Sequence, residues 1–168
     1  MNDISRKEKK IRRLLILFVT ALILSGVTAF PLVSELKLIQ RMNLWLPSVM
    51  QDWFRKVSDA LFQTNSRYPF MAYGTDWLAF AHIIIALFFY APYRDPLKYM
   101  LILDIGIIAC LLVFPLAFFC GSIRGIPFFW QLIDCSFGFT GILLLSFIRK
   151  NCLHLRLLHQ SITNSHAL

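Results

Sequence analysis

The stretch TDWLAFAHIIIALFFYAPYRDP, residues 75–96, decides the fold class, because it is long and apolar enough to cross a membrane as a helix. It carries Asp76 near its start and His82 among phenylalanine, isoleucine and leucine side chains. An ionisable side chain is costly in hydrocarbon, so we expect it to have a partner or a function there. The stretch therefore predicts both a membrane span and a site within it.

The composition of the whole chain indicates the same class. Hydrophobic residues make up 58% of the 168 residues and charged residues 15%, which is more apolar surface than one small soluble core buries. The net charge of +8 comes from basic residues that lie where membrane topology favours them, and not from a stripe on a soluble domain. We therefore expect a polytopic membrane protein with the lipid bilayer as its partner, and no nucleic-acid binding.

Apolar segments long enough to span a membrane, about 20 helical residues with shorter runs tolerated, occur four times. They are residues 14–30, 75–92, 99–119 and 128–148. The chain shows no internal repeat and no Gly/Ser linker. The prediction is a single all-α domain over residues 1–168, an integral membrane four-helix bundle.

Basic residues predict the orientation of these spans. The segments expected inside hold eleven of the 17 Lys and Arg residues, six of them before the first span, and the outer segments hold six. Both termini are therefore predicted to be cytoplasmic, in an inner or plasma membrane. The first span also fits a cleavable signal peptide, with Val27 and Ala29 at the small-residue positions, but we interpret it as a retained helix.

The long first outer loop contains a second kind of helix. In PSVMQDWFRKVSDALFQ, residues 47–63, apolar side chains recur at helical spacing opposite charged ones, which predicts an amphipathic outer helix. Trp53 and Phe54 on its apolar face suit the headgroup region of a membrane. We expect this helix to lie on the lipid surface or as a lid across the outer mouth of the bundle.

Two ionisable side chains on different spans are predicted at the same depth. His82 lies about 10 Å below Thr75, and Asp134 lies about 9 Å below Phe128, at 1.5 Å per helical residue. A carboxylate and an imidazole that meet inside a membrane satisfy each other. The predicted catalytic residues are therefore His82 as acid or base, Asp134 as the group that orients it, and Asp76 as a second acid.

Three further residues complete the predicted outer site. Arg124, in the loop before the fourth span, would anchor an anionic group, and Trp77 and Trp130 would contact the same ligand. The alternative is that polar and small residues only hold helices together. Four residues of the fourth span fit that role: Ser136, Gly138, Thr140 and Gly141.

Asp104 is predicted in the inner half of the membrane, away from this site. The third span starts inside, so Asp104 lies near its inner end. Its candidate partners are Tyr90, Arg94, Lys98 and Arg149.

Several specific reaction types need residues that this sequence does not provide. The four cysteines form no CxxC pair for disulfide exchange, and only His82 among the histidines lies in a span, whereas a bundle haem needs two. A single metal on His82, Asp76 and Asp134 is left open, but we predict no metal site, and the cofactor is unknown.

Cys135 or Ser136 is a weak nucleophile candidate. Cys152, below the fourth span, fits a palmitoylation site.

Two functions follow from this pattern. The first is a membrane protein that binds, and chemically handles or supplies protons to, a small polar or lipid-like ligand in an outer-leaflet pocket. The second is a non-catalytic accessory or assembly subunit, in a homo-oligomer or a larger membrane complex, for which its apolar spans and 16 phenylalanines would provide contact surface.

Overall fold

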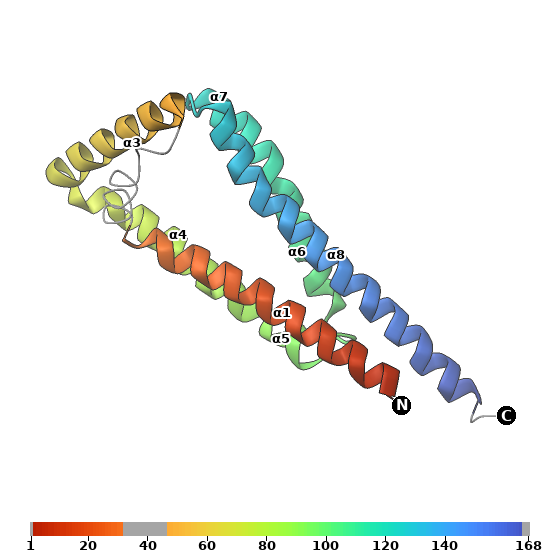
Figure 1. The fold of residues 1–168 in the computed structure, drawn as a ribbon. Helices are drawn as coiled ribbons and strands as arrows, with labels where there is room; N and C mark the ends of the chain where they lie inside the picture. The colour runs from red at the N-terminus through yellow and green to blue at the C-terminus, as the bar shows by residue number, and fades with distance from the viewer. Residues whose placement is uncertain (1, 32–46, 166–168) are drawn as a thin grey trace. The chain divides into compact units, whose positions relative to one another are not determined.

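The computed structural model of the chain describes residues 2–31 and 47–165 (Figure 1). Its longer helices are α1 (Asn2–Ala29), α3 (Ser48–Arg67), α4 (Ala72–Phe88), α6 (Met100–Pro115) and α8 (Phe128–Ser165). Its short helical segments are η2 (Pro69–Met71), α5 (Tyr90–Arg94), η3 (Leu116–Cys120) and α7 (Gly121–Ile123). These two described ranges contain no β-strand, so the all-α class predicted from the sequence is confirmed.

Within the described residues, four helical stretches are long and apolar enough to cross a membrane, as predicted. They are Ser5–Ala29, Pro69–Arg94, Met100–Ile123 and Phe128–Leu158. Each is longer than the apolar run seen in the sequence, because a helix satisfies its backbone groups internally and continues through polar residues. The difference is largest for α8, which runs to Ser165 although its apolar run ends near residue 148.

The chain divides into two compact units, and each is described by itself. Unit 1 contains Met1–Thr20 and Leu87–Leu168, and unit 2 contains Ala21–Ala86. The first part of α1 therefore belongs to unit 1 and its last part to unit 2. A four-helix bundle formed by both units stays a prediction.

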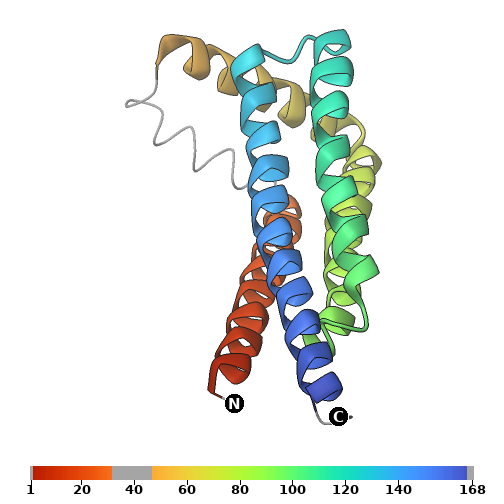
Figure 2. The same cartoon turned by 90° about the vertical axis from the view of Figure 1, so that its right-hand side faces the viewer.

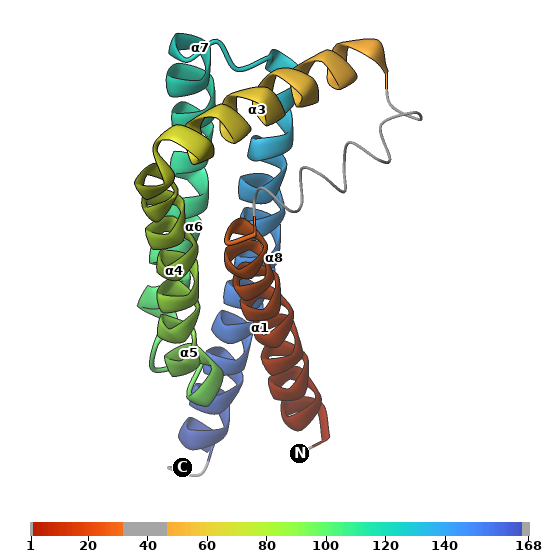
Figure 3. The ribbon, with the colours of Figure 1, turned by 90° about the vertical axis from the view of Figure 1, so that its left-hand side faces the viewer.

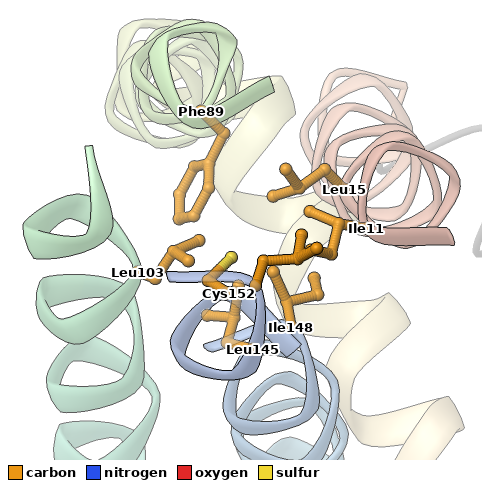
Figure 4. Close-up of a cluster of buried hydrophobic side chains, with 8 residues drawn as sticks. Ile11, Leu15, Phe89, Leu103, Leu145, Ile148 and Cys152 are labelled. Atoms are coloured by element: carbon orange, nitrogen blue, oxygen red, sulfur yellow. The ribbon is translucent and has the colours of Figure 1, made fainter. Parts of the chain in front are cut away.

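The core of unit 1 is built on one face of α8. The buried residues of this face recur at intervals of three and four, the spacing of a helix seam that packs against other helices. They are Gln131, Cys135, Gly138, Gly141, Leu145, Ile148, Cys152 and Leu155. Ile11 and Leu15 of α1, Leu103 of α6 and Phe89 pack on the last four of these residues (Figure 4). The start of α1 and the end of α8 consequently lie at the same end of unit 1 (Figure 2).

Cys152 is a core residue of this seam. Its side chain is fully buried among leucine and isoleucine side chains (Figure 4). An acyl chain cannot be attached to a thiol in that position without opening the core. The palmitoylation site expected from the sequence is therefore wrong, because the helical register turns this cysteine inward.

Helices α6 and α8 lie side by side, and they approach closely where α8 has glycine (Figures 1 and 2). A Cβ on Gly138 would lie 2.8 Å from the backbone oxygen of Cys110 and 3.2 Å from Cβ of Val113. A Cβ on Gly141 would lie 2.6 Å from Sγ of Cys110. At Gly138 a side chain would push the helices apart, and at Gly141 it would displace the Cys110 thiol, so the predicted role of these glycines in close helix packing is confirmed.

The two hydroxyl residues of the same helix behave differently. Ser136 and Thr140 are exposed, and each donates a hydrogen bond to its own helix, at 2.6 Å to the Ile133 carbonyl and 2.8 Å to the Ser136 carbonyl. A hydroxyl bonded to the preceding turn needs no partner on another helix. Neither hydroxyl bonds another helix within the described residues, and their role in helix packing stays a prediction.

The far end of α6 is shaped by a proline and a glycine. Pro115 has no N–H to donate and crowds the turn before it, and the helix continues as the π-helical segment η3. The chain then turns at Gly125, whose φ of 67° suits only glycine well and whose N–H donates to the Ser122 carbonyl at 3.1 Å. This turn leaves Arg124 at the end of α7 and leads the chain into α8.

In unit 2, the last part of α1 packs against α4 at Gly26. A Cβ on Gly26 would lie 2.7 Å from the backbone oxygen of Ala79 and 2.9 Å from Cβ of His82. The missing side chain lets the two helices touch at this level. α3 precedes α4 in the chain and is joined to it through η2 (Figure 3).

The helix expected over residues 47–63 corresponds to α3, which starts at Ser48 after Pro47 and ends at Arg67. Its charged residues Asp52, Arg55, Lys56 and Asp59 are exposed. The buried residues are Phe54, as expected for the apolar face, and Ser58, which the pattern did not indicate. Docking of α3 on a membrane surface or as a lid stays a prediction.

Candidate functional site

A groove in unit 2 contains two of the predicted site residues, Asp76 and Trp77. Its volume is about 300 Å³, and its other lining residues are Phe30, Tyr73 and Phe80. The rings meet edge to face, with centroid separations of 6.0 Å between Tyr73 and Trp77 and 6.1 Å between Trp77 and Phe80. Asp76 is partly buried, and its carboxylate has no hydrogen bond or ion pair within residues 2–31 and 47–165. The arrangement provides an apolar aromatic wall next to one carboxylate.

His82 finds its hydrogen-bond partner on its own helix. Its Nδ1 lies 2.8 Å from the backbone oxygen of Leu78. A carbonyl oxygen only accepts, so Nδ1 carries a proton and donates, which leaves Nε2 for another partner. This bond answers part of the question raised by the sequence, because a partly buried imidazole has one nitrogen satisfied without a second helix.

Unit 1 contains the other three predicted residues. Arg124 is exposed at the end of α7, where its backbone N–H donates to the Cys120 carbonyl at 3.0 Å, and its guanidinium makes no hydrogen bond or ion pair with the described part of the chain. Trp130, partly buried in the first turn of α8, meets Phe129 edge to face at 6.5 Å. Asp134 lies one turn further along α8, partly buried, and its carboxylate has no hydrogen bond or ion pair among the described residues. All three lie toward the same end of unit 1.

The predicted pairing of His82 with Asp134 joins a residue of unit 2 to a residue of unit 1. Each is placed within its own unit as described above. Their pairing stays a prediction. The same holds for a shared pocket formed by His82, Asp134, Asp76 and Arg124.

Sequence reasoning missed Gln131. Its side chain is 4% exposed, and its Nε2 donates a hydrogen bond of 2.8 Å to the Ile126 carbonyl. The side chain also covers Gly121, because a Cβ there would lie 3.0 Å from Cγ of Gln131. Gln131 therefore closes the turn between α7 and α8. Gln131 lies four residues before Cys135, on the same buried face of the helix, and this spacing is the sequence signal that could have identified Gln131 as a buried residue.

A second groove lies in unit 1, around Asp104. Of the four partners proposed for Asp104 from the sequence, the structure selects Arg149, whose Nε donates to Oδ1 of the carboxylate. The ion pair lines an open groove of about 510 Å³ between α6 and α8. The other lining residues are Ile107, Ile108, Ser146, Lys150 and Leu153.

No family model, no curated protein and no solved structure matches this sequence. Among the described residues, no group of three or more His, Cys, Asp or Glu side chains lies close enough to hold a metal ion. The chemistry of the two grooves therefore has to be argued from their own side chains.

Proposed function

We propose that the chain is a four-span membrane protein, with both termini cytoplasmic, that binds a small polar or lipid-like ligand in the outer half of the bilayer. Four apolar helices support the placement. The spacing of side chains on α8 supports it too, because 19 residues separate Trp130 from Arg149, about 29 Å of helix. This length matches a hydrocarbon core of about 30 Å with an aromatic and a basic residue at its two borders.

The ligand proposal rests on one observation: within residues 2–31 and 47–165, the Asp76 carboxylate has no hydrogen bond or ion pair and lies beside four aromatic rings. A half-buried carboxylate is stabilised by a cation or by N–H and O–H donors. Aromatic faces attract both apolar chains and cationic groups. The ligand that fits is an amphiphile whose apolar part packs on Trp77 and Phe80 and whose donor or cationic group meets Asp76.

His82 supplies the chemical part of this proposal. It lies six residues after Asp76 on α4, and its Nε2 is not used by the bond to Leu78. As an acceptor in the neutral ring, Nε2 can take up and return a proton. Acid or base work on the ligand, or proton supply to it, is the role that we propose for His82.

Substitution of the groove residues should remove the ligand. Trp77→Ala should lower affinity about 30-fold, since an aromatic side chain that becomes buried under the ligand contributes on the order of 2 kcal/mol to binding, and Asp76→Asn should lower it about tenfold. Native mass spectrometry of protein purified from membranes in mild detergent measures the fraction that carries a bound small molecule. Both variants should show less of it than the wild-type chain.

Phe88→Ala is the matched control, because Phe88 is also an aromatic residue of α4, is 63% exposed and does not line the groove. Its bound fraction should equal that of the wild-type chain. If all three variants kept the bound molecule, or if none was ever bound, the ligand proposal would be wrong. The accessory-subunit function would then take its place.

The proposed orientation can be measured by labelling single cysteines with an impermeant thiol reagent in intact cells. In a chain whose four native cysteines are replaced, Asp59→Cys on α3 should react and Ser5→Cys should not. Both positions are exposed, whereas the neighbouring Ser58 is fully buried and would report burial rather than sidedness. The opposite labelling pattern would reverse the orientation and place the aromatic groove toward the cytoplasm.

A further inference from the structure

The position of the Asp104–Arg149 pair follows from the packing of α6 against α8 in unit 1. Asp104 follows the fully buried Leu103, and Arg149 follows the fully buried Ile148. On two antiparallel helices, the residues just after facing core positions lie on the same flank of the contact. The flank of the α6–α8 contact therefore carries one carboxylate and one guanidinium side by side, 36% and 40% exposed.

The groove beside this pair has excess positive charge. Asp104 neutralises Arg149, one of the two cations of the groove, and the exposed Lys150 ammonium has no hydrogen bond or ion pair in the described part of the chain. Further cations lie at this end of unit 1, among them Lys10, whose Nζ lies 4.7 Å from the centre of the Phe147 ring. An anionic group is therefore attracted to this end.

Arg149 is held in place for a second acceptor. Its bond to Asp104 engages Nε, one of five N–H donors on the guanidinium. The ion pair restricts the side chain, so its terminal nitrogens meet another acceptor at a reduced entropic cost. Phosphate oxygens suit this planar fork and an adjacent lysine ammonium.

The groove is amphipathic along the direction of α8. Arg149 lies about 31 Å from Phe128 along the helix, which is close to the thickness of the hydrocarbon core, so its guanidinium lies at the border where the lipid headgroups begin. Ile107 and Ile108 line the part of the groove further along α6 from Asp104. A ligand with a phosphate and an acyl chain, a phospholipid, matches both ends.

We propose that this groove binds the phosphate of an anionic phospholipid in the cytoplasmic leaflet. Lys150 and the terminal nitrogens of Arg149 contact the phosphate, and the acyl chain packs on Ile107 and Ile108. The proposal uses the membrane placement given above but not the ligand of unit 2. The two sites share no residue.

The test uses the full chain in a nonionic detergent, with dioctanoyl phosphatidylglycerol as the probe and native mass spectrometry to count bound lipid. Phosphatidylglycerol should bind more tightly than dioctanoyl phosphatidylcholine, which has no net charge. Lys150→Gln should weaken phosphatidylglycerol binding about fivefold, the effect of one cation near a lipid surface, and Lys150→Arg should restore it. Inorganic phosphate at equal concentration should not displace the lipid.

Arg156→Gln is the matched control, because Arg156 is an exposed cation on α8 that does not line the groove. It should leave binding unchanged. Equal loss in Lys150→Gln and Arg156→Gln would overturn the site, since only total charge would matter. Equal binding of the two lipids would mean that the groove only contacts the apolar acyl chains. Displacement of the lipid by inorganic phosphate would mean that the groove binds a free anion. Either result would also overturn the proposal.

Discussion

Gly138→Leu should destabilise unit 1 more than any other glycine substitution on α8. A Cβ at this position meets the backbone oxygen of Cys110 at 2.8 Å, and a backbone atom cannot rotate away as a side chain can. The helices must separate along the seam, and overpacking of this kind costs about 1–3 kcal/mol and occasionally more. Thermal unfolding in detergent should show a clearly lowered midpoint, read as a relative value if unfolding is irreversible.

Two other glycines provide the comparison. Gly74→Leu is the same substitution on α4 at a position where a Cβ meets nothing within 4 Å, and it should leave stability unchanged or raise it by up to about 1 kcal/mol. Gly141→Ala should cost less than Gly138→Leu, because it meets only Sγ of Cys110 within 3.0 Å, and that thiol can change rotamer. If Gly138→Leu were as harmless as Gly74→Leu, the close α6–α8 packing would be wrong.

The number and place of the apolar helices could be predicted from the sequence, because crossing a membrane requires a length and a composition that a single segment displays. The leucines after residue 150 also favour a fourth helix that continues beyond its apolar run, and α8 does continue, as far as Ser165. The start of the first helix could not be predicted, because the basic residues before residue 14 are helical although they are polar. Backbone hydrogen bonds extend a helix wherever no glycine or proline stops it, and hydropathy does not report them.

Which residues meet across helices could be predicted only as alternatives. The sequence left Asp104 with four candidate partners, and the choice of Arg149 follows from the burial of Leu103 and Ile148, which is a property of packing. Phe30 was missed as a groove residue for the same reason, since its contact with α4 depends on the approach at Gly26. Asp76 and Trp77 were predicted because a carboxylate and an indole near the mouth of a span are visible in one segment.

Breaking the Asp104–Arg149 pair should show strong energetic coupling. Asp104→Ala leaves the Arg149 guanidinium without its carboxylate, and Arg149→Ala leaves a carboxylate beside apolar side chains. Each single change should cost about 1–3 kcal/mol, the range for hydrogen bonds between charged groups, with the lower part favoured because both side chains are over one third exposed. The double variant removes both charges together and should be no less stable than the worse single variant.

The cycle is measured by thermal unfolding in nanodiscs, and a second cycle with Asp104→Ala and Arg156→Ala serves as its control. Arg156 is exposed and has no ion pair among the described residues, so those two losses should add. The exchange Asp104→Arg with Arg149→Asp keeps one charge of each sign on the two helices and should recover part of the stability lost in either single variant.

Strictly additive losses for Asp104 and Arg149 would mean that the pair does not hold α6 against α8. The guanidinium would then not be restrained for a phosphate, and the lipid groove would lose the geometry on which it depends.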